Sequence, residues 1–278
     1  MEHKTFQELN LSDDFLFAKV MEDEEILKPV IEKILGIRIQ RLTLVQPQKV
    51  IEIKPEAKGI RLDIFADDDK NNRYSVEMQK CNEYNLDKRG RYYHSMMDLD
   101  LLRRGENYRK LQKNCVIFIC LFDPFRQGRH RYTFESRCME VPELSLTDGL
   151  QTVFLSTRGT SADVDEDMMQ FLRYIECSTA ETAESSESSL VKLLHEKVKH
   201  VKSDEMREAE YMKLLERDEM NYERGRDAGR EEGIQAFVLD NMEESVPRER
   251  TIEKLMKRFA LNEEAAAAYY EKYGEASE

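Results

Sequence analysis

One short run of residues constrains the fold more than any other. The residues from Cys115 to Phe122 (CVIFICLF) are all apolar, and they are bounded by Asn114 and by the pair Asp123-Pro124. An unbroken apolar run of this length is typical of a central strand that is buried on both faces. Such a strand needs cover on each side, so the run predicts a sheet with helices packed against it.

Helical and strand patterns alternate around this run. Ser12, with Asp13 and Asp14 after it, predicts a helix N-cap with acidic residues in the first turn. The apolar spacing that follows predicts one or two helices ending at Gly36. Pro29 fits the start of the second helix or a kink within a longer one. The later predicted elements are strands at 37–45, 49–53, 59–66 and 73–79, a helix at 83–104, strands at 115–122, 131–136 and 151–155, and a helix at 165–175.

The resulting order, α-β-β-β-α-β with additions, predicts an α/β fold with a mixed central sheet. The low-complexity stretch 177–189 (CSTAETAESSESS) predicts a break in the chain after this sheet domain. We therefore expect a first domain at 1–178, a linker at 179–189 and an acidic helical region at 190–278.

Within the C-terminal region, Gly225, Gly229 and Gly233 recur every four residues along one side of a predicted helix. Each glycine costs about 1 kcal/mol inside a helix. The spacing therefore indicates either close approach to a partner helix, which predicts a homodimer through this helix, or a frayed tail. Two short helices follow Pro247, but a DNA-binding helix-turn-helix is disfavoured because the second is acidic and carries only Lys272.

Composition limits the compartment and the class of protein. No apolar run approaches the roughly 20 residues that a membrane span requires, so we expect no membrane insertion. No apolar segment follows a basic one near the N-terminus, so we also expect no secretory signal. The five cysteines lack CxxC spacing, which argues against a zinc site and a disulfide framework. These features predict a cytoplasmic protein.

The distribution of charge qualifies the net charge of −13. Residues 1–178 carry a net charge of −4 and residues 179–278 carry −9. Between Asn82 and Arg137 the balance reverses, since twelve Lys and Arg residues face seven carboxylates. This stretch could meet phosphates, although solvated faces of a helix and a hairpin explain it equally well.

Two carboxylates stand out within the predicted strands. Asp63 lies in the alternating segment 61–65, where it shares a face with Arg61 and Phe65, and Glu77 shares a face with Gln79. If the two strands pair as an antiparallel hairpin, Asp63 and Glu77 converge near its open end. Adjacent carboxylates repel one another unless a cation joins them, so the pair predicts a Mg²⁺ or Mn²⁺ site. The alternative is that both are ordinary surface positions on a hairpin.

The core Asp63, then Glu77-Met78-Gln79, resembles the catalytic motif of the PD-(D/E)XK nucleases. The flanking segments 11–15 (LSDDF), 89–93 (RGRYY) and 105–108 (GENY) place it closer to the recombination-promoting branch, the PD-(D/E)XK nuclease family transposases. The resemblance covers roughly residues 10–178. It implies a restriction-endonuclease-like αβββαβ core, followed by the helical C-terminal extension.

The resemblance also implies roles for the matched positions. Asp63 and Glu77 would bind the metal together with the backbone carbonyl of Met78. Gln79 would take the place of the superfamily's lysine, as in this branch, whereas Lys80 points to the opposite face of a regular strand. An acidic residue from the first helix often completes such sites, and the candidates are Asp14 and then Glu32.

DNA contacts are expected from the helix after the motif, where Arg89, Arg91 and Tyr93 lie. Tyr93 could equally serve by packing on the sheet. The sequence thus favours a Mg²⁺-dependent endodeoxyribonuclease, associated with mobile elements or recombination. One alternative is a catalytically weak or inactive nuclease-fold module that binds DNA or assembles with proteins. Another is an adaptor that uses its acidic tail to bind other proteins.

Overall fold

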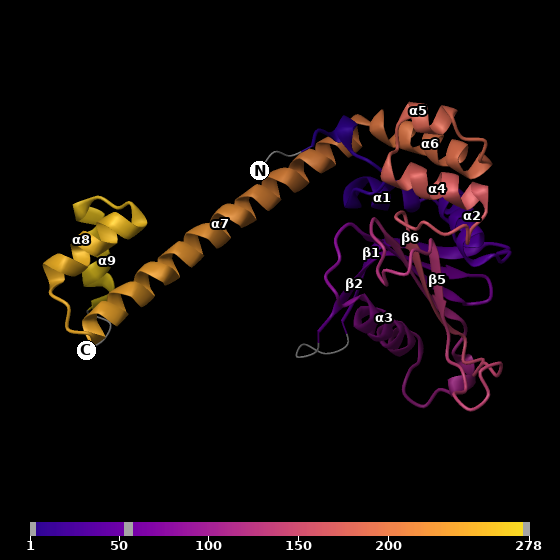
Figure 1. Ribbon diagram of the computed structural model, residues 1–278, viewed down its shortest axis with the longest axis horizontal. Helices are drawn as coiled ribbons and strands as arrows, with labels where there is room; N and C mark the ends of the chain where they lie inside the picture. Colours follow the sequence, from indigo (N-terminus) through magenta and orange to yellow (C-terminus); the bar gives the residue numbers. More distant parts are fainter. Residues whose placement is uncertain (1–3, 53–57, 275–278) are drawn as a thin grey trace. The chain divides into compact units, whose positions relative to one another are not determined.

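The computed structural model describes residues 4–52 and 58–274 of the chain. Contacts divide the chain into two compact units, Met1–Glu208 and Ala209–Glu278 (Figure 1). Within the described residues, no helix combines the length and the apolar character that crossing a membrane requires.

The first unit is built on a six-stranded mixed sheet in the order β1-β2-β3-β4-β6-β5. Its strands are β1 (Leu42–Ile51), β2 (Ile60–Asp68), β3 (Arg73–Gln79), β4 (Asn114–Cys120), β5 (Arg131–Phe134) and β6 (Leu150–Ser156). Neighbours β1, β2 and β3 are antiparallel, whereas β3, β4 and β6 are parallel and β5 is antiparallel to β6. The predicted α/β class with a mixed central sheet is confirmed.

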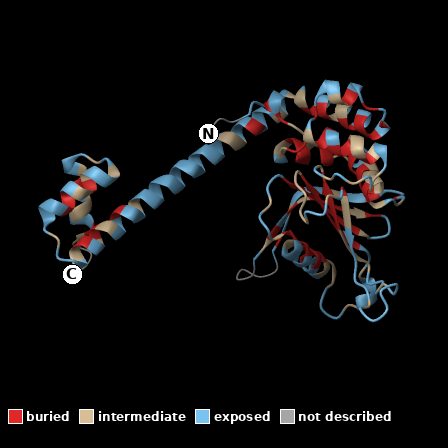
Figure 2. Cartoon of the chain, in the orientation of Figure 1, coloured by how far each residue is buried: buried red, intermediate tan, exposed pale blue. Residues whose placement is uncertain are grey.

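Residues 115–120 of the apolar run form most of the central strand β4, and each residue of that strand is buried. Figure 2 shows buried residues in red along the sheet. Val116 and Phe118 pack in one cluster with Tyr93 and Met97 of helix α3 (Leu86–Leu101). The alternate residue, Ile117, is also fully buried and points to the opposite face. Both faces of the strand are therefore covered, as its unbroken apolar residues after Asn114 require.

The remaining helices of this unit pack together and against the β1–β2 side of the sheet. They are α1 (Asp14–Met21), α2 (Glu24–Leu35), α4 (Glu166–Glu176), α5 (Ala180–Glu184) and α6 (Ser189–Lys202), with short 3-10 turns at Phe6–Glu8 and Tyr108–Lys110. Gly36 ends α2 as predicted, with a φ of 66° that suits glycine. Pro29 lies inside α2 rather than at its start.

The structure differs from the prediction around β1. Parts of the predicted strands 37–45 and 49–53 form one strand, Leu42–Ile51, that passes through Pro47, and residue 53 of the second prediction lies outside the described residues. A proline is tolerated there because β1 is an edge strand, and an edge position does not require every backbone N–H. The other predicted strands and helices of this unit are present with shifts of a few residues at their ends.

The structure also places the division between the units later than the predicted linker at 179–189. The polar residues of that stretch are helix caps, since the Thr179 and Ser188 side chains accept backbone N–H groups at the starts of α5 and α6. Helix α6 then packs against α1 and α2, burying Val191 and Leu194. Composition alone made these capping residues resemble a linker.

Helix α7 (Glu205–Glu243) begins in the first unit, and all but its first residues belong to the second. The second unit also contains α8 (Arg248–Phe259) and α9 (Glu263–Gly274). Ile234, Val238 and Leu255 form the centre of its small core. The predicted pair of short helices is confirmed, and they are joined at Ala260, whose φ is 51°. Outside the helix's own backbone, a Cβ added at Gly225 or Gly229 would meet no atom of the described residues within 4 Å, whereas one at Gly233 would touch Phe259 at 3.8 Å.

Candidate active site

The candidate site lies where β2 and β3 separate. Their paired residues end at Ile64 and Val76, so Asp63 and Glu77 occupy the next opposed positions. Beyond this point the two strands no longer exchange backbone hydrogen bonds. The side chains of Asp63 and Glu77 accept hydrogen bonds from backbone N–H groups instead. The Asp63 N–H donates to Glu77 Oε1 at 3.2 Å, and the Met78 N–H donates to Asp63 Oδ2 at 3.0 Å. The structure therefore brings the two predicted carboxylates together.

Burial and proximity make this pair of carboxylates hard to ionise. Glu77 is 1% exposed, and burial, followed by the charge of Asp63, raises its pKa to about 8. Burial also raises the pKa of Asp63, and the charge of Asp14 adds to that effect. Three influences favour the charged form of Glu77, namely a hydrogen bond from the Ser75 hydroxyl at 2.6 Å, the hydrogen bond from the Asp63 N–H and the nearby Arg89.

These residues fit a divalent metal by the chemistry of their donors. Among the described residues, Asp63 Oδ1 and Glu77 Oε2 accept no hydrogen bond, so each carboxylate keeps an oxygen for a ligand. The Met78 N–H points toward Asp63, and in an extended strand the carbonyl of the same residue points to the same side. This set of hard oxygen donors is the kind that Mg²⁺ and Mn²⁺ prefer.

A third carboxylate does not join the pair. Within the described part of the chain, no cluster of three acidic, histidine or cysteine side chains is arranged to hold a metal. Asp14 acts on Asp63 through its charge, but its Oδ1 lies 3.3 Å from the Lys80 ammonium. Glu32 accepts the Ile39 N–H at 2.7 Å and serves the end of α2. Lys80 pairs with Asp13 and Asp14, away from the pair.

Gln79 is buried and is held by Arg89 from α3. Gln79 Oε1 accepts from Arg89 Nη1 at 3.0 Å, and Arg89 Nη2 donates to the Tyr93 hydroxyl at 3.0 Å. A guanidinium only donates hydrogen bonds, so the Gln79 atom facing it must be the carbonyl oxygen. The Gln79 NH₂ group is thereby left as the end that can donate to a further group. The motif prediction identified Gln79 and Arg89 separately, but not this contact between them.

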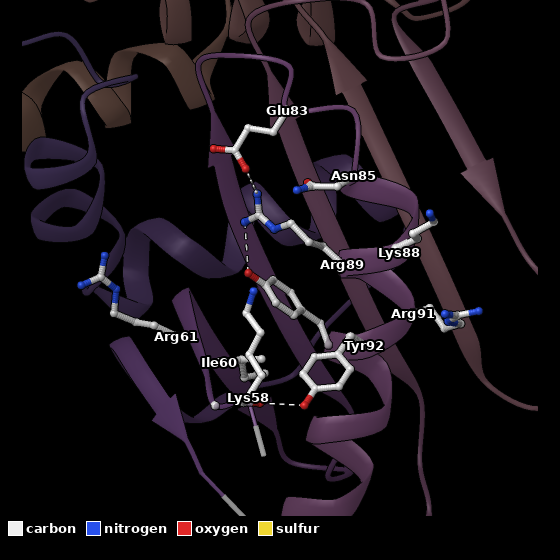
Figure 3. Close-up of a pocket in the computed structure, with 11 residues that line it drawn as sticks. Lys58, Ile60, Arg61, Glu83, Asn85, Lys88, Arg89, Arg91 and Tyr92 are labelled. Carbon is white, nitrogen blue, oxygen red and sulfur yellow. Dashed lines mark hydrogen bonds and ion pairs between the residues drawn. The ribbon is translucent and has the colours of Figure 1, made fainter. Parts of the chain in front are cut away.

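A groove opens beside the pair, between the start of β2 and the first turns of α3 (Figure 3). Its volume is about 690 Å³, and it is lined by Lys58, Gly59, Ile60, Arg61, Glu83, Asn85, Lys88, Arg89, Arg91, Tyr92 and Tyr93. Two residues that line the groove act on the carboxylate pair through their charge. The positive charges of Arg61 and Arg89 each lower the pKa of Asp63, although burial outweighs them and leaves that pKa raised. The predicted DNA-contact residues Arg89, Arg91 and Tyr93 all line it.

Three further residues that line the groove, Lys58, Arg61 and Tyr92, lie outside the roles that the sequence motif implies. The alternation of side chains along a strand places Arg61 on the same face as Asp63. That pattern is sufficient to predict that Arg61 lies near the carboxylate pair. Lys58 and Tyr92 carry no such signal, because the contact that joins them links the segment just before β2 to α3. The Tyr92 hydroxyl donates to the Lys58 carbonyl at 2.7 Å.

Comparison with known families decides the classification. The sequence profile of the PD-(D/E)XK nuclease family transposases matches residues 12–232, which include the sheet, the carboxylate pair, the groove and most of α7. The chain belongs to this family. Searches of curated proteins and of solved structures found no significant match.

Membership in the PD-(D/E)XK nuclease family transposases makes this a nuclease-fold protein of a family linked to mobile elements. The family match extends to residue 232, beyond the sheet and through much of α7. The family generally uses divalent metal ions, which agrees with the donor set of Asp63, Glu77 and the Met78 carbonyl.

Proposed function

We propose that this protein is a Mg²⁺- or Mn²⁺-dependent DNA endonuclease that serves mobile-element or recombination functions. One observation carries the proposal. Two mutually repelling carboxylates, each with an oxygen that accepts no hydrogen bond from any described residue, lie within the electrostatic reach of Arg89, which lines a basic groove. If the two carboxylates served only to stabilise the fold, groups within the protein would compensate both charges. The charges of Asp63 and Glu77 are not compensated in this way.

Each residue has a chemical task in this proposal. Asp63, Glu77 and the Met78 carbonyl hold the cation, and Asp14 adds negative charge from α1. When bound, the cation would supply the charge that activates water and stabilises a phosphoryl oxygen. Gln79 donates its NH₂ hydrogens to the phosphate or to the attacking water. Arg89, bound to Gln79 at 3.0 Å, supplies the positive charge that the amide lacks.

The second candidate function is a catalytically weak or inactive module that binds DNA or assembles with proteins. Gln79 favours it, because an amide can neither carry a positive charge nor lose a proton at neutral pH. The net charge of −13 favours it as well, since the long-range field opposes DNA. Binding that depends steeply on salt but is never followed by cleavage would support this function.

The deciding experiment measures nicking of supercoiled plasmid with Mg²⁺, with Mn²⁺ and with EDTA. Wild type is compared with Asp63→Asn and Glu77→Gln, which keep the shapes of the side chains. Asp69→Asn, at the closed end of the same hairpin, is the matched control. Metal-dependent nicking that is lost only in the first two variants supports the nuclease. Folded wild-type protein that nicks under no metal would leave the module as the function.

A homodimer through α7 would suit cleavage of both strands, because two-fold symmetry places two sites against one duplex. Its support is the helix surface at Gly225 and Gly229, where an added Cβ would meet nothing within 4 Å. Light scattering at micromolar concentration tests it. A dimer mass is expected for wild type and a monomer mass for the double variant Gly225→Glu, Gly229→Glu. Arg226→Glu, on the same exposed stretch, is the control, and a monomeric wild type would contradict the proposal.

A further inference from the structure

The groove beside the carboxylates has an excess of unpaired positive charge. Among the described residues, Lys58, Arg61, Lys88 and Arg91 line the groove without an ion pair to any carboxylate. On the part of the lining that the structure describes, Glu83 is the only acidic residue; it lies 3.9 Å from Arg89 and is itself exposed. Uncompensated cations along one groove indicate a ligand that carries several negative charges, as a nucleic-acid backbone does.

The groove also presents an aromatic ring among these cations. Tyr92 is 37% exposed, and its hydroxyl is fixed by the Lys58 carbonyl at 2.7 Å. Figure 3 shows this contact at one end of the groove, with Arg61 on the strand side and Arg89 on the helix side. A ring held in this way has lost most of its rotational freedom before any ligand arrives. It can therefore offer a flat surface at low entropic cost.

An exposed ring in a phosphate-binding groove favours unpaired bases over a duplex. In a duplex the faces of the bases are stacked on one another, and a protein reaches only their edges. A single strand exposes base faces, and aromatic side chains stack on them without regard to sequence. The size of the groove agrees, because its 690 Å³ lies in the range of about 300–1,000 Å³ that encloses one small ligand, and so suits a nucleotide or two of one strand.

We propose that this groove binds a single unpaired DNA strand, with phosphates on Lys58, Arg61 and Arg89 and one base stacked on Tyr92. As the substrate path of a nuclease, the groove rests on the proposed function. As a binding site it does not. The preferred substrate is then single-stranded DNA, or duplex that is frayed or opened at the site, and the strand enters the carboxylate pair past Arg61.

Binding is measured in EDTA by the fluorescence anisotropy of a short labelled oligonucleotide, alone and annealed to its complement. We expect the full-length wild type to bind the single strand at least about tenfold more tightly than the duplex. Tyr92→Leu should weaken single-strand binding by about 5- to 150-fold, which is the range for loss of one stacked base, and should leave duplex binding unchanged. Tyr92→Phe keeps the ring and should stay within a few-fold of wild type.

Salt dependence tests the phosphate contacts. Arg61→Ala should reduce the slope of log affinity against log salt for the single strand by about 0.7. Arg38→Ala, a fully exposed cation at the end of α2, is the control and should leave the slope unchanged. Circular dichroism establishes that each variant is folded. Duplex binding as tight as single-strand binding, tighter binding of an RNA strand, or no effect of Tyr92→Leu would overturn the proposal.

The outcome for the groove is separable from that for the nuclease. Single-strand binding that depends on Tyr92 in EDTA, with no cleavage when Mg²⁺ or Mn²⁺ is added, would uphold the groove and refute the nuclease. Cleavage of plasmid with unchanged single-strand affinity in Tyr92→Leu would uphold the nuclease and refute the groove.

Discussion

The two ends of the β2–β3 hairpin carry similar acidic residues in opposite electrostatic states. At the closed end, buried Asp68 accepts hydrogen bonds from the Tyr74 hydroxyl at 2.9 Å and from Asn72, and Asp67 lies 3.6 Å from Arg73. At the open end, Asp63 and Glu77 face each other, and each keeps an oxygen that accepts no hydrogen bond from the described residues. Among the described residues, Asp67 Oδ1 accepts no hydrogen bond, so the compensation at the closed end belongs to Asp68, whose two oxygens both accept hydrogen bonds. The same pair of strands thus has a hydrogen-bonded buried carboxylate at one end and an uncompensated pair at the other.

This difference separates structure from function within one hairpin. Compensated carboxylates stabilise the fold when they are buried, because removal of a partner leaves an orphaned polar group. Uncompensated carboxylates cost stability, and a protein keeps them where a ligand will complete them. Substitutions at the closed end should therefore lower stability, whereas substitutions at the open end should lower activity.

The largest expected effect is on cleavage by open-end variants. Asp63→Asn and Glu77→Gln should each reduce metal-dependent nicking by about 100-fold or more, because the charge that holds the cation is lost. The same variants should also lose the rise in melting temperature that Mn²⁺ produces in wild type. Retention of both responses in either variant would show that the cation binds elsewhere.

The next effect is on stability at the closed end. Asp68→Ala should lower the free energy of unfolding by about 2–4 kcal/mol, since it leaves the Tyr74 hydroxyl and Asn72 without their acceptor. Urea denaturation measures the change, with exposed Asp69→Ala as the control. A loss as large in Glu77→Gln as in Asp68→Ala would abolish the proposed distinction between the two ends.

A smaller effect tests the contact between Arg89 and Gln79. Arg89→Gln should lower the nicking rate by about tenfold, because it removes one charge-assisted interaction near the reacting phosphate. Adding Gln79→Lys to that variant should restore part of the rate by placing a positive charge at the motif position itself. If the double variant Arg89→Gln, Gln79→Lys is slower than Arg89→Gln alone, a positive charge at this position does not replace Arg89. Arg89 would then act only by holding Gln79 in place. In that case the charge assignment fails.

A further effect is on the pH dependence of stability in EDTA. The folded pKa of Glu77 is raised to about 8 from the usual 4.5, so its protonated form stabilises the fold below the lower value. That contribution is lost as pH rises through the folded pKa. The melting temperature of wild type should therefore fall relative to Glu77→Gln between pH 5 and 8, and Mg²⁺ should reverse the fall. Parallel curves for the two proteins would contradict the raised pKa.

Alternation along strands made the core of the site predictable. It placed Asp63 and Glu77 on opposed strands and Arg61 beside Asp63, and a one-residue shift would have moved each side chain to the other face. The contact between Gln79 and Arg89 was not predictable in this way. It depends on how α3 is rotated on the sheet, and that rotation is set by the packing of Tyr93 and Met97.

The same distinction explains the fold. The apolar run 115–122 identified the central strand because a strand that is buried on two faces needs apolar residues at every position. The caps Thr179 and Ser188 misled the prediction because serine and threonine favour linkers and helix N-termini alike. Only the apolar spacing of α6, seen against α1 and α2, resolves which of the two they are.

Pro47 in β1 has a consequence for how copies of this protein can meet. An edge strand exposes a row of backbone donors and acceptors that can template the sheet of another molecule. The missing N–H of Pro47 and the positive φ of Gln48, 51°, interrupt that row near its middle. The opposite edge, β5, is only four residues long. Both edges of the sheet are therefore poor templates for an added strand, which protects the sheet against aggregation. Self-association of this protein would then use helical surfaces.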